Sequence, residues 1–179
     1  MKTLRSVIFG IALLLLTSCN TMSSWSRNAN PLVLTLELEE RNVHSFEDLH
    51  LQLSLLNQSN SRLLVQSLGW RPSAPKGMFA MTIMIWDSFG IPVDQIPVFV
   101  NGDFPGEDTM TVLGPGEQKK RPIDLSFGYS ASKFKSGKVY TIVAYYQNDL
   151  DVTKSIDGVD VPSWVGSIRS NKVTFVILP

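Results

Sequence analysis

Residues 138–147 read KVYTIVAYYQ and give the clearest strand signal in the sequence. Two alternating sets of side chains run along this stretch: Val139, Thr141, Val143 and Tyr145 on one side, and Tyr140, Ile142, Ala144 and Tyr146 on the other. β-Branched and aromatic residues favour strands because they pack well on a pleated surface whose successive side chains point to opposite faces. The stretch therefore predicts a β-strand in the C-terminal half of the chain.

The same period of two recurs on both sides of this segment. In residues 32–39 and 49–55, leucine occupies every second position. Alternation over seven residues predicts half-buried strands, and the pattern carries this prediction because leucine itself is a weak strand former. Residues 79–86 (FAMTIMIW) are apolar on both faces, which predicts a central strand or a strand with a covered outer face. Shorter strands are predicted at residues 63–68, 109–113, 119–125 and 172–178.

Turn-forming residues separate these segments and predict how they are arranged. Residues 57–61 (NQSNS) and 114–117 (GPGE) are compact turn signals. Three longer stretches, residues 69–78, 87–108 and 148–167, are expected to be loops. After the first nineteen residues no run of ten has apolar positions at helical spacing, and residues 126–134 hold at most one helical turn. Short strands with turns between them predict an all-β, antiparallel sandwich.

The closing segments resemble those of bacterial immunoglobulin-like domains. The features that carry the resemblance are Leu113-Gly-Pro-Gly-Glu117, Asp124-Leu-Ser126, Gly137 ahead of Tyr140, and Ser170-Asn171 before the last strand. Gly137 with Tyr140 is similar to the tyrosine corner, whose hydroxyl bonds to upstream backbone. The inter-sheet cysteine pair of antibody domains is absent, and the domain exceeds the roughly 100 residues usual for the fold. The resemblance implies an immunoglobulin-like β-sandwich over residues 31–179, with long loops.

The first nineteen residues have the form of a targeting segment. Lys2 and Arg5 precede a ten-residue apolar run at 7–16, and about 20 apolar residues are needed to span a bilayer as a helix. The run therefore has the length of a signal-peptide core. Leu16-Thr17-Ser18-Cys19 resembles the lipobox of bacterial lipoproteins. That resemblance implies that residues 1–18 are a signal peptide, cleaved before Cys19, with diacylglycerol on the Cys19 sulfur and an acyl chain on the new amine.

The tether and the charge balance define the expected surroundings. Residues 19–30 comprise the acylated cysteine and a polar, aperiodic tether. Asn20 follows the cysteine where enteric-type lipoproteins retained in the inner membrane carry Asp, which implies the outer membrane, facing the periplasm. The chain has 16 basic and 16 acidic residues, and cleavage removes Lys2 and Arg5, so the mature charge is −2. This balance predicts no nucleic-acid partner, and membrane contact through the lipid alone.

Catalytic and cofactor motifs are not found in the sequence. His44 and His50 have Glu47 and Asp48 between them, but no third histidine or free cysteine completes a zinc set. The single cysteine, Cys19, is assigned to the anchor. The sequence contains no G-x-S-x-G nucleophile elbow, phosphate-binding loop or dinucleotide fingerprint. We therefore expect no enzymatic activity and no cofactor other than the covalent lipid.

Two groups of residues are candidate binding sites. Four carboxylates in one predicted loop are candidate ligands for Ca²⁺, although the EF-hand spacing is not met, and a solvated acidic loop is the alternative: Asp149, Asp151, Asp157 and Asp160. Four aromatic residues in or beside predicted loops resemble recognition anchors: Trp70, Phe89, Phe104 and Trp164. The alternative for these aromatic residues is that they fold back and cap the sandwich.

The expected function is that of a membrane-anchored lipoprotein without enzymatic activity. Its sandwich would bind or help assemble an envelope protein through an exposed patch at one end or through an open edge strand. One alternative is a protease inhibitor that presents a loop such as residues 101–108. A second alternative is a calcium- or carbohydrate-binding accessory domain that uses the loop at 149–160 or an aromatic platform.

Overall fold

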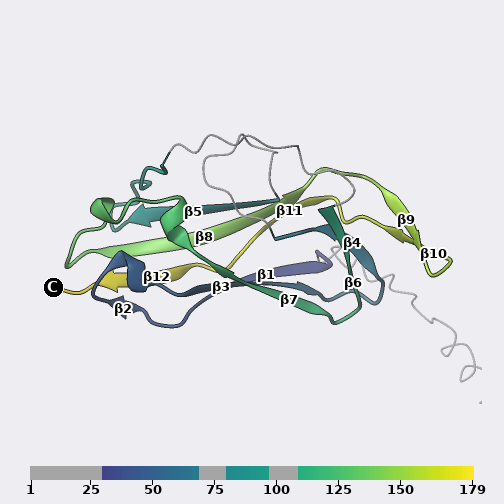
Figure 1. Ribbon diagram of the computed structural model, residues 1–179, viewed down its shortest axis with the longest axis horizontal. Helices are drawn as coiled ribbons and strands as arrows, with labels where there is room; N and C mark the ends of the chain where they lie inside the picture. Colours follow the sequence, from purple (N-terminus) through teal and green to yellow (C-terminus); the bar gives the residue numbers. More distant parts are fainter. Residues whose placement is uncertain (1–29, 69–79, 97–108) are drawn as a thin grey trace, which may run out of the picture.

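The computed structural model describes residues 30–68, 80–96 and 109–179, which fold into two packed layers of β-strands (Figure 1). The elements are β1 (Leu32–Leu38), β2 (Asn42–Val43), η1 (Phe46–Asp48), β3 (Leu51–Asn57), β4 (Leu63–Gln66), β5 (Met81–Asp87), β6 (Met110–Leu113), β7 (Gln118–Ile123), η3 (Leu125–Phe127), η4 (Ala131–Lys133), β8 (Val139–Asn148), β9 (Thr153–Ile156), β10 (Val159–Pro162), β11 (Gly166–Arg169) and β12 (Val173–Ile177). The ladders between these strands are antiparallel except that of β2 with β12, so the predicted all-β antiparallel sandwich is confirmed. No described helix is long and apolar enough to cross a membrane.

The first sheet has the spatial order β1-β3-β7. Leu36 of β1 lies opposite Leu53 of β3, and the two side chains are 1% and 0% exposed. On the opposite face of the same pair, Glu37 lies opposite Gln52 and is exposed. The alternating leucine face predicted from the sequence therefore points into the core. β3 begins at Leu51 rather than at residue 49. The short helix η1 ends at Asp48, and the Leu49 N–H still donates to the Phe46 carbonyl of that helix.

The second sheet is built around β8, the strand predicted most clearly. β5 pairs with residues 140–146 of β8, while β12 pairs with residues 139–142 and β11 with residues 145–148. Because β5 spans the same length, β11 and β12 must share the opposite edge of β8. The register shifts by one residue between β11 and β12, which marks a β-bulge.

The bulge between β11 and β12 also joins the two sheets. The Ser170 N–H donates to the Ala144 carbonyl at 2.9 Å, and the Ser170 hydroxyl accepts from the Ala144 N–H at 2.9 Å, which keeps the ladder bonded. The Asn171 side chain crosses to β1, where it accepts from the Leu36 N–H at 2.8 Å and donates to the Leu36 carbonyl at 2.9 Å. One amide therefore pairs both outward backbone groups of Leu36 on the edge of the first sheet.

Aromatic rings fill the core near the C-terminal end. Phe46 and Phe134 stack with ring centroids 3.8 Å apart, and Tyr140 stacks on Phe175 at 5.3 Å. The Tyr140 hydroxyl accepts a hydrogen bond from the Lys135 N–H at 2.8 Å, five residues upstream. The bond that the sequence predicted for a tyrosine corner is thus present.

The prediction that residues 148–167 form a loop is wrong. β9 and β10 form an antiparallel hairpin, and β11 begins at Gly166 and adds to β8. The tight turn between β9 and β10 is Asp157-Gly158, with φ of 54° and 75°. Asp-Gly with both φ positive is typical of a type I′ hairpin turn, a signal that a count of acidic residues overlooks.

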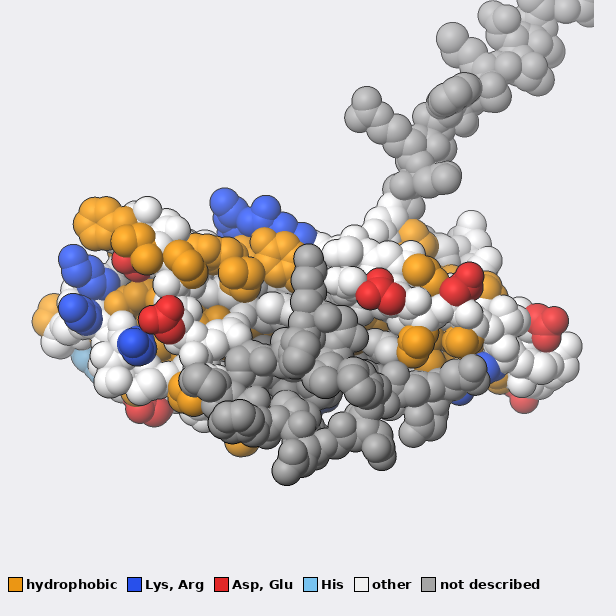
Figure 2. All heavy atoms as spheres, turned by 90° about the horizontal axis from the view of Figure 1, so that it is seen from above, with side chains coloured by type: hydrophobic (Ala, Val, Ile, Leu, Met, Phe, Trp, Pro, Cys, Tyr) orange, Lys and Arg blue, Asp and Glu red, His pale blue; other side chains and the backbone are white. Residues whose placement is uncertain are grey.

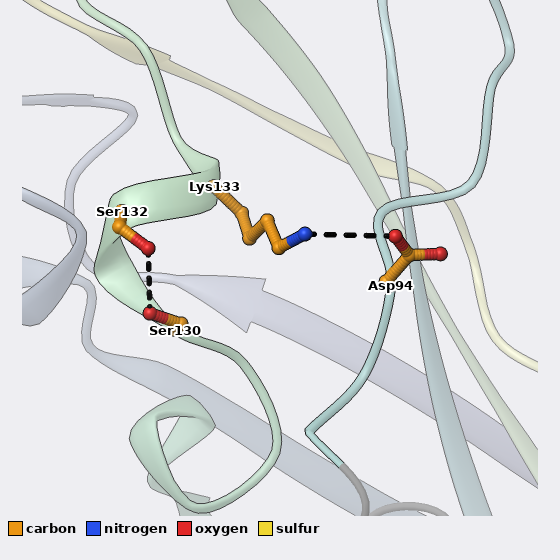
Figure 3. A network of polar contacts seen from close by, with 4 residues as sticks. All are labelled: Asp94, Ser130, Ser132 and Lys133. Carbon is orange, nitrogen blue, oxygen red and sulfur yellow. Dashed lines mark hydrogen bonds and ion pairs between the residues drawn. The ribbon is translucent and has the colours of Figure 1, made fainter.

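The outer edge of β5 is covered by part of the expected loop at 87–108. The Val93 N–H donates to the Ile85 carbonyl at 2.8 Å, and the Tyr129 hydroxyl donates to the Ile83 carbonyl at 2.9 Å. Lys133 of η4 reaches toward this covering segment and contacts Asp94, N to O, at 3.6 Å (Figure 3). The segment from 91 to 96 therefore closes an edge that would otherwise stay open to strand pairing.

The described chain begins and ends at opposite ends of the sandwich. Leu32 lies opposite Asn57, whose side-chain amide donates to the Leu113 carbonyl at 2.9 Å beside β4 and β6. At the other end, Ile177 of β12 lies beside Val43 of β2. Figure 1 shows the C-terminus at the end away from β4, β6 and the β9–β10 hairpin.

Candidate functional site

A rigid turn at the C-terminal end holds apolar side chains in solvent. Residues 87–91 connect β5 to the segment that covers its edge. One Asp87 carboxylate oxygen accepts from the Phe89 and Ile91 N–H groups, both at 2.9 Å. The Asp87 N–H in turn donates to the Ile91 carbonyl at 2.9 Å, and Gly90 has φ of 77°. Four backbone groups of the turn are thereby fixed by local bonds.

Three exposed apolar residues meet here and are called the apolar tip: Phe89, Ile91 and Val139. Their side chains are 78%, 59% and 42% exposed. They lie near one another because Asp87 pairs with Tyr140, the residue after Val139. The Lys138 ammonium lies 5.8 Å from the Phe89 ring centroid. Figure 2 shows hydrophobic side chains beside Lys and Arg at this end of the molecule. The exposed fraction of Phe89 places this predicted anchor on an accessible surface.

Trp164 is not an exposed anchor, so the expectation of a recognition role for this residue is corrected. Its side chain is 6% exposed and stacks on Tyr146 with ring centroids 5.6 Å apart. The backbone N–H of Trp164 donates to the Leu64 carbonyl at 2.9 Å, and the backbone carbonyl of Trp164 accepts from the Asn148 side chain. At Gly166 a Cβ would lie 3.1 Å from the Trp164 ring, so a larger residue would have to displace the ring slightly, and the φ of 147° at Gly166 strains any other residue. Trp164 caps the sandwich, the alternative that its sequence context left open.

The four aspartates do not form the calcium site considered from the sequence. Asp149 accepts from the Gln147 side chain at 2.8 Å, and Asp157 in the hairpin turn lies 3.7 Å from the guanidinium of Arg62, which directly precedes β4. Asp151 precedes β9 and Asp160 lies on β10. Among the residues that the structure describes, no group of three or more His, Cys, Asp and Glu is placed to hold a metal ion. The carboxylates are distributed over the segment before β9, the hairpin turn and β10, because this stretch is a hairpin and not a single loop.

Several predicted sites lie outside the described residues. These are Cys19 with the signal peptide and most of the tether, Trp70, Phe104 and the loop at 101–108. Their roles stay predictions from the sequence.

A shallow depression of about 440 Å³ lies on the first sheet. It is lined by Glu37, Leu38, Glu39, His50, Leu51, Gln52 and Pro122. Its carboxylates and His50 belong to the described part of the chain, where no metal-binding group is found. We assign no site to this depression.

Two buried tyrosines were not identified from the sequence as special positions. The Tyr129 hydroxyl accepts from the Gln95 side chain at 2.9 Å, and the Tyr146 hydroxyl donates to the Gln66 carbonyl at 3.0 Å. Burial raises the pKa of both phenols above the ordinary value of 10.0. Both hydroxyls stay protonated at neutral pH. Tyr129 is bonded to Gln95 of the segment that covers β5, and Tyr146 links β8 to β4.

No protein-family model matches this chain, and no curated protein matches it. The function is therefore inferred from the sequence motifs and from the geometry of the described residues.

Proposed function

We propose that this chain is an outer-membrane lipoprotein, anchored through acylated Cys19, that uses its sandwich to bind an envelope protein on the periplasmic side. It has no enzymatic activity in this proposal. The observation that carries the proposal is the apolar tip, where Phe89 is 78% exposed on a turn fixed by hydrogen bonds. An exposed aromatic side chain on a rigid support is typical of a binding anchor.

The energetics favour the tip as a contact surface. Burying one large apolar side chain contributes roughly 1.5–3 kcal/mol relative to leaving it in water. The turn fixes the backbone of Phe89 and Ile91 before any partner arrives, so less backbone entropy is lost on binding than from a loop without these bonds. Lys138 beside the ring adds a positive charge at the rim of the patch. These features supply an apolar centre with a polar border, the usual anatomy of a protein interface.

The position of the tip suits a tethered binding protein. The described chain starts at the end that carries β4 and β6, and the tip lies at the opposite end. Residues 20–30 span at most roughly 40 Å when fully extended. An anchor at Cys19 would therefore hold the sandwich near the membrane with the apolar tip directed away from it.

The strand order supports the proposed immunoglobulin-like relationship. One sheet has the order β1-β3-β7, and β8 of the other sheet lies between β5 and β12. This matches the arrangement of strands A-B-E facing C-F-G in immunoglobulin domains. The hydroxyl of Tyr140, at the start of β8, bonds to the backbone of Lys135 as in a tyrosine corner.

Site-specific photocrosslinking tests the proposal. Benzoyl-phenylalanine is placed at position 89 in the full-length chain, and in a control at Val159, an exposed apolar residue of the hairpin at the opposite end. We expect one defined envelope protein to crosslink from position 89 and not from position 159. Phe89→Ser is expected to weaken binding of that purified partner at least about tenfold, which corresponds to about 1.4 kcal/mol. Absence of any crosslinked protein, or equal products from both positions, would contradict the tip as the binding site.

A further inference from the structure

The outer edge of β7 carries backbone groups without a partner in the sandwich. Asn57 of β3 donates its N–H to the Glu117 carbonyl at 3.0 Å, and alternate residues 119, 121 and 123 face β3 in the same way. The N–H and carbonyl groups of Gln118 and Lys120 therefore point away from the sheet. Among the described residues, nothing pairs with them. This edge has the geometry to accept one more strand.

Three consecutive cations lie along the same edge and are called the basic strip: Lys119, Lys120 and Arg121. Lys120 and Arg121 are exposed, and the Lys119 ammonium donates to the Thr111 hydroxyl on β6. The two ion pairs found in the described residues, Arg62–Asp157 and Lys133–Asp94, do not involve the strip. Its positive charge is therefore not offset by ion pairs within the described part of the chain.

The neighbouring acids Glu117 and Asp124 form no ion pair with the strip among the described residues. The Glu117 carboxylate accepts from the Gly114 N–H at 2.7 Å, and the Asp124 carboxylate accepts from the Ser126 N–H at 2.9 Å. Both carboxylates are thus bonded to turns at the two ends of β7. The basic strip concentrates positive charge in a domain whose mature chain is negative overall.

The cations occupy both sides of the edge strand. Arg121 lies opposite Leu53, which is 0% exposed, so Arg121 is on the core-facing side, while Lys120 lies opposite Ser54 on the outer side. Charges on an edge strand and a proline such as Pro122 disfavour pairing with a like strand. A second copy of β7 would place its own cations beside Lys119, Lys120 and Arg121, and like charges repel. The carboxylates of an acidic strand would be attracted to the same three cations.

We propose that the basic strip of β7 binds an extended acidic segment of a partner protein, which adds to the first sheet as a fourth strand. Backbone bonds to Gln118 and Lys120 set its register, and alternating carboxylates contact the cations. Pro122 offers no N–H and borders the depression that contains Glu37 and Glu39, so the added strand is confined to residues 118–121. This proposal rests on the proposed function in one respect only: both take the sandwich to be a domain that binds other proteins.

A peptide titration tests the charge requirement. The probe is a fluorescein-labelled, end-capped peptide of alternating Glu and Thr, added to the full-length protein in neutral detergent and followed by fluorescence anisotropy. We expect saturable binding at low salt that weakens at 0.3 M salt, because salt screens exposed charges. The triple variant Lys119→Gln, Lys120→Gln, Arg121→Gln should bind at least tenfold more weakly. The matched variant Lys133→Gln, Lys135→Gln, Lys138→Gln should bind as the wild type does. Absence of binding to the wild type, or equal loss in both triple variants, would overturn the proposal.

A backbone variant tests strand addition separately from charge. Gln118→Pro removes an outward N–H without changing any charge, and Pro122 shows that β7 holds proline at an outward position. We expect Gln118→Pro to bind at least fivefold more weakly than Gln118→Ala. Equal affinities would reject strand addition. Should the proline variant not fold, hydrogen exchange of the wild type decides: the peptide must slow exchange at the Gln118 and Lys120 amides, and unchanged exchange would reject the proposal.

The apolar tip provides the remaining control. Phe89→Ser should leave the peptide affinity unchanged, because the tip and the basic strip are separate surfaces. A loss of peptide binding in Phe89→Ser would show that the strip is not an independent site. If position 89 gave no crosslink, the proposed role of the apolar tip would be rejected. Peptide binding at the basic strip would still be tested by its own experiment.

Discussion

At the scale of single residues, polar side chains pair backbone groups that the strands leave open. Asn171 pairs both outward groups of Leu36 and thereby links the two sheets. Asn57, at the end of β3, donates to the carbonyls of Ser61 and Leu113. These bonds lie where the chain passes from β3 to β4 and from β6 to β7. A buried backbone group without a partner costs about as much as a lost hydrogen bond. These two amides therefore stabilise the sandwich at an edge and at a bend where its regular ladders end.

The two buried tyrosines make the stability of the fold depend on pH. Burial raises the pKa of Tyr129 and Tyr146 above 10.0, whereas the unfolded chain releases the same protons near that pH. Above pH 10 the unfolded state binds fewer protons than the folded state. The free energy of unfolding should therefore fall as pH rises above 10, and the contribution of these tyrosines is fully present below it.

Urea unfolding at a series of pH values between about 8 and 11 measures this dependence. The control is the double variant Tyr129→Phe, Tyr146→Phe, which retains every lysine of the chain. We expect its unfolding midpoint to fall less steeply with pH than that of the wild type. Equal slopes would contradict the shifted pKa values.

At the scale of elements, the β9–β10 hairpin shows how local turn chemistry overrides composition. Its acidic residues suggested a ligand site, but Asp157 and Gly158 form a turn with positive φ at both positions. Val161 of the same hairpin is 1% exposed, and Ser163 at its end forms a bridge with Leu64 of β4. The hairpin therefore belongs to the packed structure at the end of the molecule where the described chain begins.

Substitutions at the hairpin turn test this assignment. Asp157→Asn should stay within about 0.5 kcal/mol of the wild type, because asparagine tolerates positive φ and an exposed ion pair contributes little. Asp157→Val should cost about 1–2 kcal/mol, because a β-branched residue is strained in that conformation. The matched control is Asp160→Val on β10, where the extended backbone suits valine. Urea unfolding measures the differences, and equal tolerance of valine at both positions would argue against the type I′ turn.

At the scale of the whole molecule, the edges and ends of the sandwich differ in what they offer a partner. The outer edge of β5 is covered by residues 91–96, and Asn171 pairs the outward groups of Leu36 on β1. The outer edge of β7, which pairs with no described residue, is charged, and the apolar tip lies at the end far from Asn30. Both proposed surfaces thus lie where no described residue covers or pairs the chain.

The proposed anchor predicts where the whole protein resides. Two or three acyl chains hold a protein on a membrane almost irreversibly, whereas one chain gives only marginal binding. We expect cells fed an alkyne analogue of palmitate to label the wild-type chain, and the protein to sediment with membranes. Cys19→Ala should abolish the label and move the protein out of the membrane fraction. Unchanged labelling of Cys19→Ala would refute lipidation at this residue.

Most of the strands were predictable, because burial on a sheet imposes a local period of two. Residues 32–38 and 139–148 show that period plainly, and in the structure Leu32, Leu34 and Leu36 of β1 and Tyr140, Ile142, Ala144 and Tyr146 of β8 are buried. β9, β10 and β11 were missed because each is only four residues long and lies among polar residues. They are strands because β9 pairs with β10 and β11 pairs with β8. Of the candidate anchors, Phe89 is exposed and Trp164 is buried, although both lie in or beside segments predicted to be loops.

The sequence by itself determined the all-β class, the alternation of side chains along the main strands and the lipobox motif at Cys19, because each depends on residues close together in the chain. Tertiary structure alone decided that Trp164 packs on Tyr146, that the four aspartates form no metal-holding group among the described residues, and that no described residue pairs with the outer edge of β7. It also brought Val139 next to the turn at 87–91. These outcomes depend on which distant strands pair and in what register, and side chains that meet only after folding leave no local pattern.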